Sequence, residues 1–137
     1  MIKIFFATSN KHKVAEIGAV LAEHGFEVVP RKLPLIEPDF DSLEEVAKFK
    51  AQQAFAQLKQ PVIVEDTGVF FEGYNNFPGA IAKRVYMGVG FGGLLALIKA
   101  AKNKRAFFRT VICFSASDKE MHLFSGKLSG HLIEKIV

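Results

Sequence analysis

Residues 62–68 read Val62-Ile63-Val64-Glu65-Asp66-Thr67-Gly68. The β-branched apolar run at the start of this stretch predicts a buried strand, with the acidic pair Glu65-Asp66 directly after it. Adjacent carboxylates there are unfavourable unless a cation or a basic side chain offsets their charge. Ligands of α/β sheets also bind beyond the carboxyl ends of strands. The stretch therefore predicts an α/β sheet with a functional site at Glu65 and Asp66. The alternative is a strand-end turn with one salt-bridged acid.

The chain has 137 residues, and we expect residues 1–137 to form a single domain. Hydrophobic residues make up 50% and charged residues 23%, which excludes an intrinsically disordered chain. No apolar run reaches membrane-spanning length, so no membrane partner is expected. The net charge of +4 suits a nucleotide as well as nucleic acid and decides neither. A single Cys excludes an internal disulfide and makes the cytoplasm the default location.

Alternating strands and helices in the first half, and strands around the turn at Asp118-Lys119 in the second, predict a mixed twisted β-sheet flanked by helices. Helices are expected behind Thr8-Ser9-Asn10, behind the capping box at Ser42, and over residues 94–102. The proline-rich residues 30–38 are expected to be irregular or edge-like, and residues 73–80 to be a loop. Strands are expected at residues 2–7, 26–29, 62–64 with 69–71, 106–115, 121–125 and 128–137.

The segment Thr8–Lys13 lies between the first strand and the first helix. Such junctions offer free backbone amides and the positive end of a helix dipole, where phosphates bind. Hydroxyls, an amide side chain and two lysines add donors and positive charge there. The alternative is an ordinary polar helix cap with solvated lysines, and this segment alone does not decide between them.

Three further features are less specific. Acids around Glu37, ahead of the second helix, interact favourably with the positive end of the helix dipole and need no ligand. Glu37 alone is a candidate second metal ligand. Mg²⁺ is usually held by one or two carboxylates together with substrate phosphates. Lys83 and Arg84 either reach phosphates or are simply solvated. The strand containing Phe107 and Phe108 lacks the aromatic–glycine signature of RNA-stacking sheets, so we expect core packing and no stable nucleic-acid partner.

In their order and spacing, these pieces resemble the Ham1/inosine triphosphate pyrophosphatase family, its archaeal members most closely. That family opens with strand–Thr-(Gly/Ser)-Asn-x-x-Lys–helix, matched at Thr8–Lys13. Its strand-terminal motif (Glu/Asp)-Asp-(Ser/Thr)-Gly is matched at Glu65–Gly68, and its Phe-Pro-Gly loop at Phe77–Gly79. An acid ahead of a Leu-Glu-(Glu/Asp)-Val helix start is matched by Glu37 and Leu43–Val46.

The resemblance implies an ITPase-like (Maf/Ham1) fold, a homodimer, and Mg²⁺-dependent hydrolysis of ITP, dITP and XTP to the monophosphate and pyrophosphate. It implies that Asp66 is the proton acceptor or a metal ligand, and both roles stay open. The metal ligands it implies are Glu37 and Asp66, with Glu65 adjacent. The substrate contacts we assign on this basis are Thr8, Ser9, Asn10, Lys13, Thr67, Gly68, Phe77, Pro78 and Gly79.

The resemblance also implies a C-terminal difference. Family members continue past this point with a Gly-(Tyr/Trp)-Asp-Pro motif, a Lys-bearing helix and a Ser-His-Arg motif that grip the base, and none of these occurs in the 137 residues. We therefore expect a C-terminally shortened fold whose base selectivity the sequence does not define. The alternatives are a nucleotide-binding protein with impaired catalysis and a Maf-like pyrophosphatase acting on modified pyrimidine nucleotides.

Overall fold

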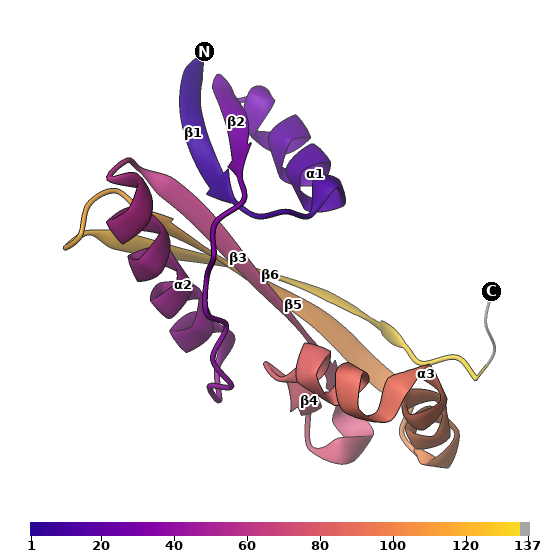
Figure 1. The fold of residues 1–137 in the computed structure, drawn as a ribbon. Helices are drawn as coiled ribbons and strands as arrows, with labels where there is room; N and C mark the ends of the chain where they lie inside the picture. Colours follow the sequence, from indigo (N-terminus) through magenta and orange to yellow (C-terminus); the bar gives the residue numbers. More distant parts are fainter. Residues whose placement is uncertain (135–137) are drawn as a thin grey trace. The chain divides into compact units, whose positions relative to one another are not determined.

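The predicted alternation of strands and helices is present in the first half of the chain (Figure 1). The computed structural model describes residues 1–134. Its elements are β1 (Ile2–Ala7), α1 (Lys11–Ala22), β2 (Phe26–Arg31), α2 (Leu43–Leu58), β3 (Val62–Phe71), the 3₁₀ helix η1 (Glu72–Tyr74), β4 (Phe77–Gly79), α3 (Ala82–Ala100), β5 (Arg105–Ser115) and β6 (Met121–His131).

All six strands belong to one sheet, in the order β2-β1-β3-β5-β6, with β4 paired to β3. β1 is parallel to β2 along its whole length and parallel to β3 at Phe5↔Val62 and Phe6↔Ile63. β4 is antiparallel to β3. The predicted mixed sheet flanked by helices is therefore confirmed. Pro30 extends β2 past its predicted end, and β2 is an edge strand, where proline is tolerated.

Residue contacts divide the chain into two compact units. The first unit consists of residues 1–38, 47–65 and 112–124, and the second of residues 39–46, 66–111 and 125–137. The expectation of a single domain over residues 1–137 stays a prediction.

In the first unit, β1 and β2 form a parallel pair, and α1 packs against β2. The helix predicted behind Ser42 is present as α2, and its residues Ala47, Ala51 and Ala54 are completely buried. At the start of α2, in the second unit, one half of the predicted capping box is confirmed, because the Glu45 amide donates to Ser42 Oγ at 3.1 Å. Buried residues that complete this core are Phe6, Val62, Val64, Cys113 and Ser115.

In the second unit, β4 pairs with β3 at Val69↔Gly79 and Phe71↔Phe77, so the loop predicted over residues 73–80 is wrong at residues 77–79, whereas residues 75, 76 and 80 are turn residues as predicted. A Cβ on Gly68 would lie 2.5 Å from the carbonyl oxygen of Gly79, so this close approach of two backbones requires glycine at position 68. Gly68 lies inside β3 rather than in a turn at its end. Gly68 thus allows β4 to pair with β3.

Helix α3 begins at Ala82, twelve residues before the predicted start at residue 94. The glycine-rich stretch is helical, apart from Gly90, whose φ of 67° and ψ of −174° interrupt the helix. Glycine disfavours a helix through backbone entropy, and this bias is why the sequence pattern missed the first half of α3. Within residues 1–134, no helix combines the length and apolarity needed to cross a membrane.

The predicted hairpin of β5 and β6 is confirmed around the turn where the Ala116 amide donates to the Glu120 carbonyl at 3.0 Å. The separate strand predicted over residues 128–137 is wrong in the described part, because residues 128–131 continue β6 and residues 132–134 are not strand. Residues 135–137 lie outside the described residues. Phe107 stacks on Phe70 with ring centroids 4.7 Å apart, whereas Phe108 is 55% exposed, so core packing is wrong for Phe108.

Cys113 is completely buried in β5. Burial raises the pKa of its thiol, because the interior disfavours the thiolate, and the charge of Lys48 only partly opposes this. We expect a disulfide reagent such as DTNB to label native protein far more slowly than protein unfolded in guanidinium. Equal labelling rates in the two states would contradict this burial.

Candidate active site

Lys13 of α1 and Glu65 of β3 form an ion pair in the first unit, with 3.4 Å between Lys13 Nζ and Glu65 Oε2. The parallel pairing of β1 and β3 at Phe6↔Ile63 brings them together. Because the strands are parallel, the residues that follow Phe6 and Ile63 lie at the same edge of the sheet. The two side chains are 27% and 15% exposed, so solvent screens this pair less than a surface pair. Glu65 therefore has the basic partner that its position requires.

The start of α1 is capped by its own loop. Asn10 Oδ1 accepts hydrogen bonds from the amides of His12 and Lys13, and Thr8 Oγ1 accepts one from the Asn10 amide. Amides that the sequence offers to a phosphate are thus engaged within the loop. The Lys13 ammonium supplies positive charge at this position, and a bound phosphate would have to compete with Asn10 for the amides.

Lys50 of α2 is a site residue that the sequence analysis did not single out. Its Nζ lies 3.3 Å from Glu37 Oε1 and donates to the backbone carbonyl of Glu65 at 2.7 Å. Its side chain is only 8% exposed. It therefore links the segment that carries Glu37 to the strand residue directly before Asp66. A lysine at helical spacing among Leu43, Ala47, Ala51 and Ala54 is the sequence signal of a buried, partnered charge.

Asp66 and Thr67 belong to the second unit and continue β3 beyond Glu65. The Thr67 hydroxyl is hydrogen bonded to the Thr110 hydroxyl of β5, with 2.8 Å between the oxygens. The next residue, Gly68, is buried against β4. The acidic pair thus lies inside a strand, not at a strand end as predicted, because β3 continues for five residues after Asp66 to Phe71 and pairs there with β4.

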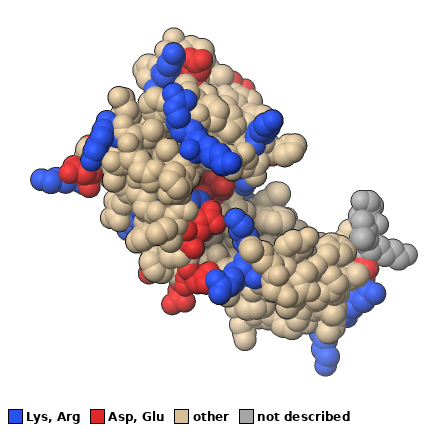
Figure 2. All heavy atoms as spheres, in the orientation of Figure 1, with Lys and Arg blue, Asp and Glu red and all other residues tan. Residues whose placement is uncertain are grey.

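The remaining predicted residues of the second unit lie in β4 and at the start of α3. Phe77 is exposed, whereas Pro78 and Gly79 are buried. Arg84 donates to Asp39 at 2.8 Å and both side chains are exposed, so part of its charge is offset by an acid. On the face drawn in Figure 2, lysine and arginine side chains are spread out with acidic side chains among them.

The carboxylates of Glu37, Glu65 and Asp66 are the oxygen ligands that Mg²⁺ prefers. Within residues 1–134, no three or more His, Cys, Asp or Glu side chains come close enough together to hold a metal ion. A Mg²⁺ ion held by one or two carboxylates and completed by substrate phosphates needs no such group. The donor chemistry of these residues fits Mg²⁺ on that condition.

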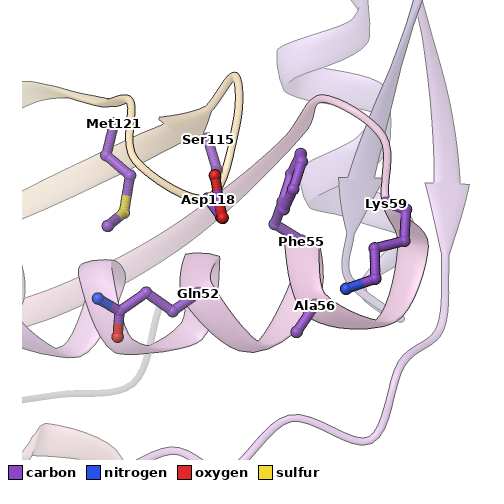
Figure 3. Close-up of a pocket in the computed structure, with 7 residues that line it drawn as sticks. All are labelled: Gln52, Phe55, Ala56, Lys59, Ser115, Asp118 and Met121. Atoms are coloured by element: carbon purple, nitrogen blue, oxygen red, sulfur yellow. The ribbon is translucent and has the colours of Figure 1, made fainter.

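A cavity of about 220 Å³ lies elsewhere in the first unit, between the C-terminal half of α2 and the turn that joins β5 to β6 (Figure 3). None of the predicted site residues lines it. Its lining residues are Gln52, Phe55, Ala56, Lys59, Ser115, Asp118 and Met121.

The sequence profile of the Ham1 family matches residues 4–136. The chain belongs to the Ham1 family. It is 40% identical to the dITP/XTP pyrophosphatase of Hyperthermus butylicus over 132 residues, covering 96% of this chain and 69% of that protein. It is 36% identical to the dITP/XTP pyrophosphatase of Ignicoccus hospitalis, covering 95% of this chain and 70% of that protein.

Solved structures of Ham1 proteins share the fold. A HAM1 protein from Coxiella burnetii superposes with a TM-score of 0.82 at 25% identity, covering 98% of this chain and 75% of that one. The Ham1 protein of Staphylococcus aureus gives a TM-score of 0.74 at 23% identity, covering 96% and 72%. The predicted ITPase-like fold is thereby confirmed.

Proposed function

We propose that this chain hydrolyses non-standard purine nucleoside triphosphates, namely ITP, dITP and XTP, to the monophosphate and pyrophosphate. The observation that carries the proposal is the 40% identity to a dITP/XTP pyrophosphatase along 96% of the chain. The two lysine–glutamate pairs of the first unit, Lys13–Glu65 and Lys50–Glu37, support it, because they supply charges that such a reaction needs. The cytoplasm, where a lone buried Cys stays reduced, is the proposed location.

The charges of the first unit suggest how the substrate is bound. The triphosphate carries negative charge that Lys13 would offset, and its arrival would draw Lys13 away from Glu65. Thr8, Ser9 and Asn10 form the loop directly before α1, which carries Lys13, and they would supply hydroxyl and amide donors. We assign Thr67, Gly68 and the β4 residues Phe77, Pro78 and Gly79 to the substrate as well.

Glu37, Glu65 and Asp66 are the residues that we propose would hold Mg²⁺. When bound, the ion would neutralise charge that builds up on the phosphates. A carboxylate at Asp66 would orient the attacking water or accept its proton while the bond between the α- and β-phosphates breaks. Lys50 would keep the backbone of Glu65 and the carboxylate of Glu37 in place during this step.

The test is pyrophosphate release from ITP, dITP, XTP, ATP, GTP and UTP, with and without Mg²⁺. We expect release from the first three only, and only with Mg²⁺. No release from any nucleotide would overturn the proposal. Thermal stabilisation by ITP without turnover would favour the impaired nucleotide-binding protein. UTP or a methylated pyrimidine triphosphate as the sole substrate would favour the Maf-like alternative.

We also propose a homodimer, formed through the first half of α3 near β4. Four large apolar side chains there are about half exposed or more, at Tyr86, Met87, Val89 and Phe91. An apolar patch of this kind marks an interaction surface, and for a single purified chain the available partner is a second copy. The dimer prediction is tested by light scattering after size-exclusion chromatography, where wild type is expected at twice the chain mass.

Met87→Glu is the matched disruption, because Met87 is 73% exposed in one chain and a buried glutamate in an interface is unfavourable. We expect this variant to run as a monomer. Val20→Glu, on the exposed face of α1, serves as the control and should remain dimeric. A monomeric wild type would contradict the dimer.

A further inference from the structure

The segment that carries Glu37 has little regular structure to hold it. Residues 32–40, between β2 and α2, belong to no strand or helix. Ile36, directly before Glu37, is 67% exposed, so burial of its side chain does not fix its position. Something other than a backbone ladder or apolar packing at Ile36 must determine where the carboxylate of Glu37 lies.

The side-chain amide of Gln53, in α2, is hydrogen bonded to both the backbone amide and the backbone carbonyl of Ile36. Gln53 Oε1 accepts from the Ile36 amide at 2.7 Å, and Gln53 Nε2 donates to the Ile36 carbonyl at 2.8 Å. A primary amide has the same donor and acceptor as a peptide unit, so Gln53 takes the place of a neighbouring strand. Gln57, one turn further on, adds a weaker bond to the Pro34 carbonyl at 3.3 Å.

The same face of α2 also contacts Glu37, the residue after Ile36, through Lys50. Lys50 precedes Gln53 by three positions and therefore lies beside it on α2. While Gln53 fixes the peptide groups of Ile36, Lys50 Nζ lies 3.3 Å from Glu37 Oε1. Gln53 has one other contact, a long bond from Nε2 to the Phe49 carbonyl at 3.4 Å, which stays within the helix.

We infer that Gln53 is a positioning residue, which sets Glu37 for the metal-bound triphosphate by clamping the backbone of Ile36. This inference rests on the proposed function for the identity of what Glu37 binds. If Gln53 had only a structural role, replacing it would change the stability of the protein and leave the metal dependence of the rate unchanged. If Gln53 positions Glu37, replacing Gln53 should raise the Mg²⁺ concentration needed for half-maximal rate, without lowering kcat once Mg²⁺ is saturating.

The test variant is Gln53→Met, which keeps the length and helix preference of the side chain and removes both polar groups. Gln52→Met is the matched control: it is the same change one residue away, at a side chain that lines the cavity of Figure 3 instead. Three quantities are measured: amide hydrogen exchange at Ile36, half-saturating Mg²⁺ for ITP hydrolysis, and Mn²⁺ affinity by electron paramagnetic resonance in the presence of α,β-methylene ITP.

We expect Gln53→Met to speed exchange at Ile36, to raise half-saturating Mg²⁺ by about tenfold, and to weaken Mn²⁺ binding by a similar factor, as the loss of two hydrogen bonds implies. Gln52→Met should match wild type in all three. Faster exchange with unchanged metal dependence would overturn the inference, and so would unchanged exchange. If Gln53→Met does not fold, Gln53→Glu replaces it, since this variant keeps the acceptor for the Ile36 amide and loses the donor.

Failure of the proposed function gives a different result. A wild type that hydrolyses none of the nucleotides removes the proposed function, and the Mn²⁺ measurement on the nonhydrolysable analogue then decides the inference alone. If Glu37→Gln leaves Mn²⁺ affinity at the wild-type value, Glu37 holds no metal and the inference is wrong, even where hydrolysis is intact.

Discussion

Asp66→Asn is expected to lower kcat for ITP hydrolysis by about a thousandfold, the middle of the range for loss of a general acid or base. The amide has nearly the size of the carboxylate, so β3 should keep its structure. It neither accepts a proton from water nor carries the negative charge that attracts Mg²⁺. The measurement is pyrophosphate release under saturating ITP and Mg²⁺, with thermal unfolding recorded for both proteins.

The matched control for this change is Asp41→Asn, an exposed acid in the run ahead of α2 that we assign to helix stabilisation. It should keep wild-type kcat. A Mg²⁺ titration of Asp66→Asn separates the two roles left open for Asp66. Partial recovery at high Mg²⁺ would identify a metal ligand, and no recovery would identify the proton acceptor. A variant that keeps more than a tenth of wild-type kcat would exclude Asp66 from both roles.

Elements with an unambiguous local pattern were predicted correctly. The apolar run at Val62–Val64 is uninterrupted and consists of β-branched residues, and it forms the start of β3. The capping box at Ser42 and the alanine stripe behind it define the start and the buried face of α2. In these segments local preference and tertiary packing favour the same structure, which is why sequence reasoning succeeded.

Elements that depend on distant partners were not predicted. β4 is three residues long and exists because Gly68 lets the backbone of Gly79 approach β3. Neither residue suggests a strand by its local preference. Residues 121–125 and 128–131 were predicted as parts of two separate strands and not as the single strand β6, because this exposed sequence lacks the alternation of apolar and polar residues by which a continuous strand is recognised.

The candidate site shows the same division. The motif residues around Lys13 and Glu65 were identified from sequence, and the structure places them 3.4 Å apart. Lys50 was missed because a lysine on a helix is usually solvated, and its spacing among apolar residues indicates burial without identifying the partners of its ammonium. Those partners come from β3 and from the irregular segment before α2, which no local pattern joins to residue 50.

Lys50→Met is the second change with a large expected effect, and it should separate activity from stability. Met fills much of the same buried space, and the Glu37 carboxylate, 44% exposed, regains water when the ammonium is gone. The Glu65 carbonyl alone loses a bonded partner, so we expect a loss of about 1 kcal/mol in unfolding free energy. That carbonyl belongs to the peptide group joining Glu65 to Asp66, so its orientation sets where the Asp66 backbone begins.

We therefore expect kcat/KM for ITP to fall by about a hundredfold, the scale on which misplacement of a reacting group slows catalysis. Lys48→Met is the control, since Lys48 is an exposed lysine two residues earlier on the same helix. It removes the same charge from the chain but no contact with Glu37 or Glu65. Equal losses of activity in both variants would mean that net positive charge matters and the Lys50 contacts do not. A Lys50→Met protein that is active but strongly destabilised would make Lys50 a residue of the core, because the free energy of its contacts would then stabilise the fold and not the arrangement of Glu37 and Asp66.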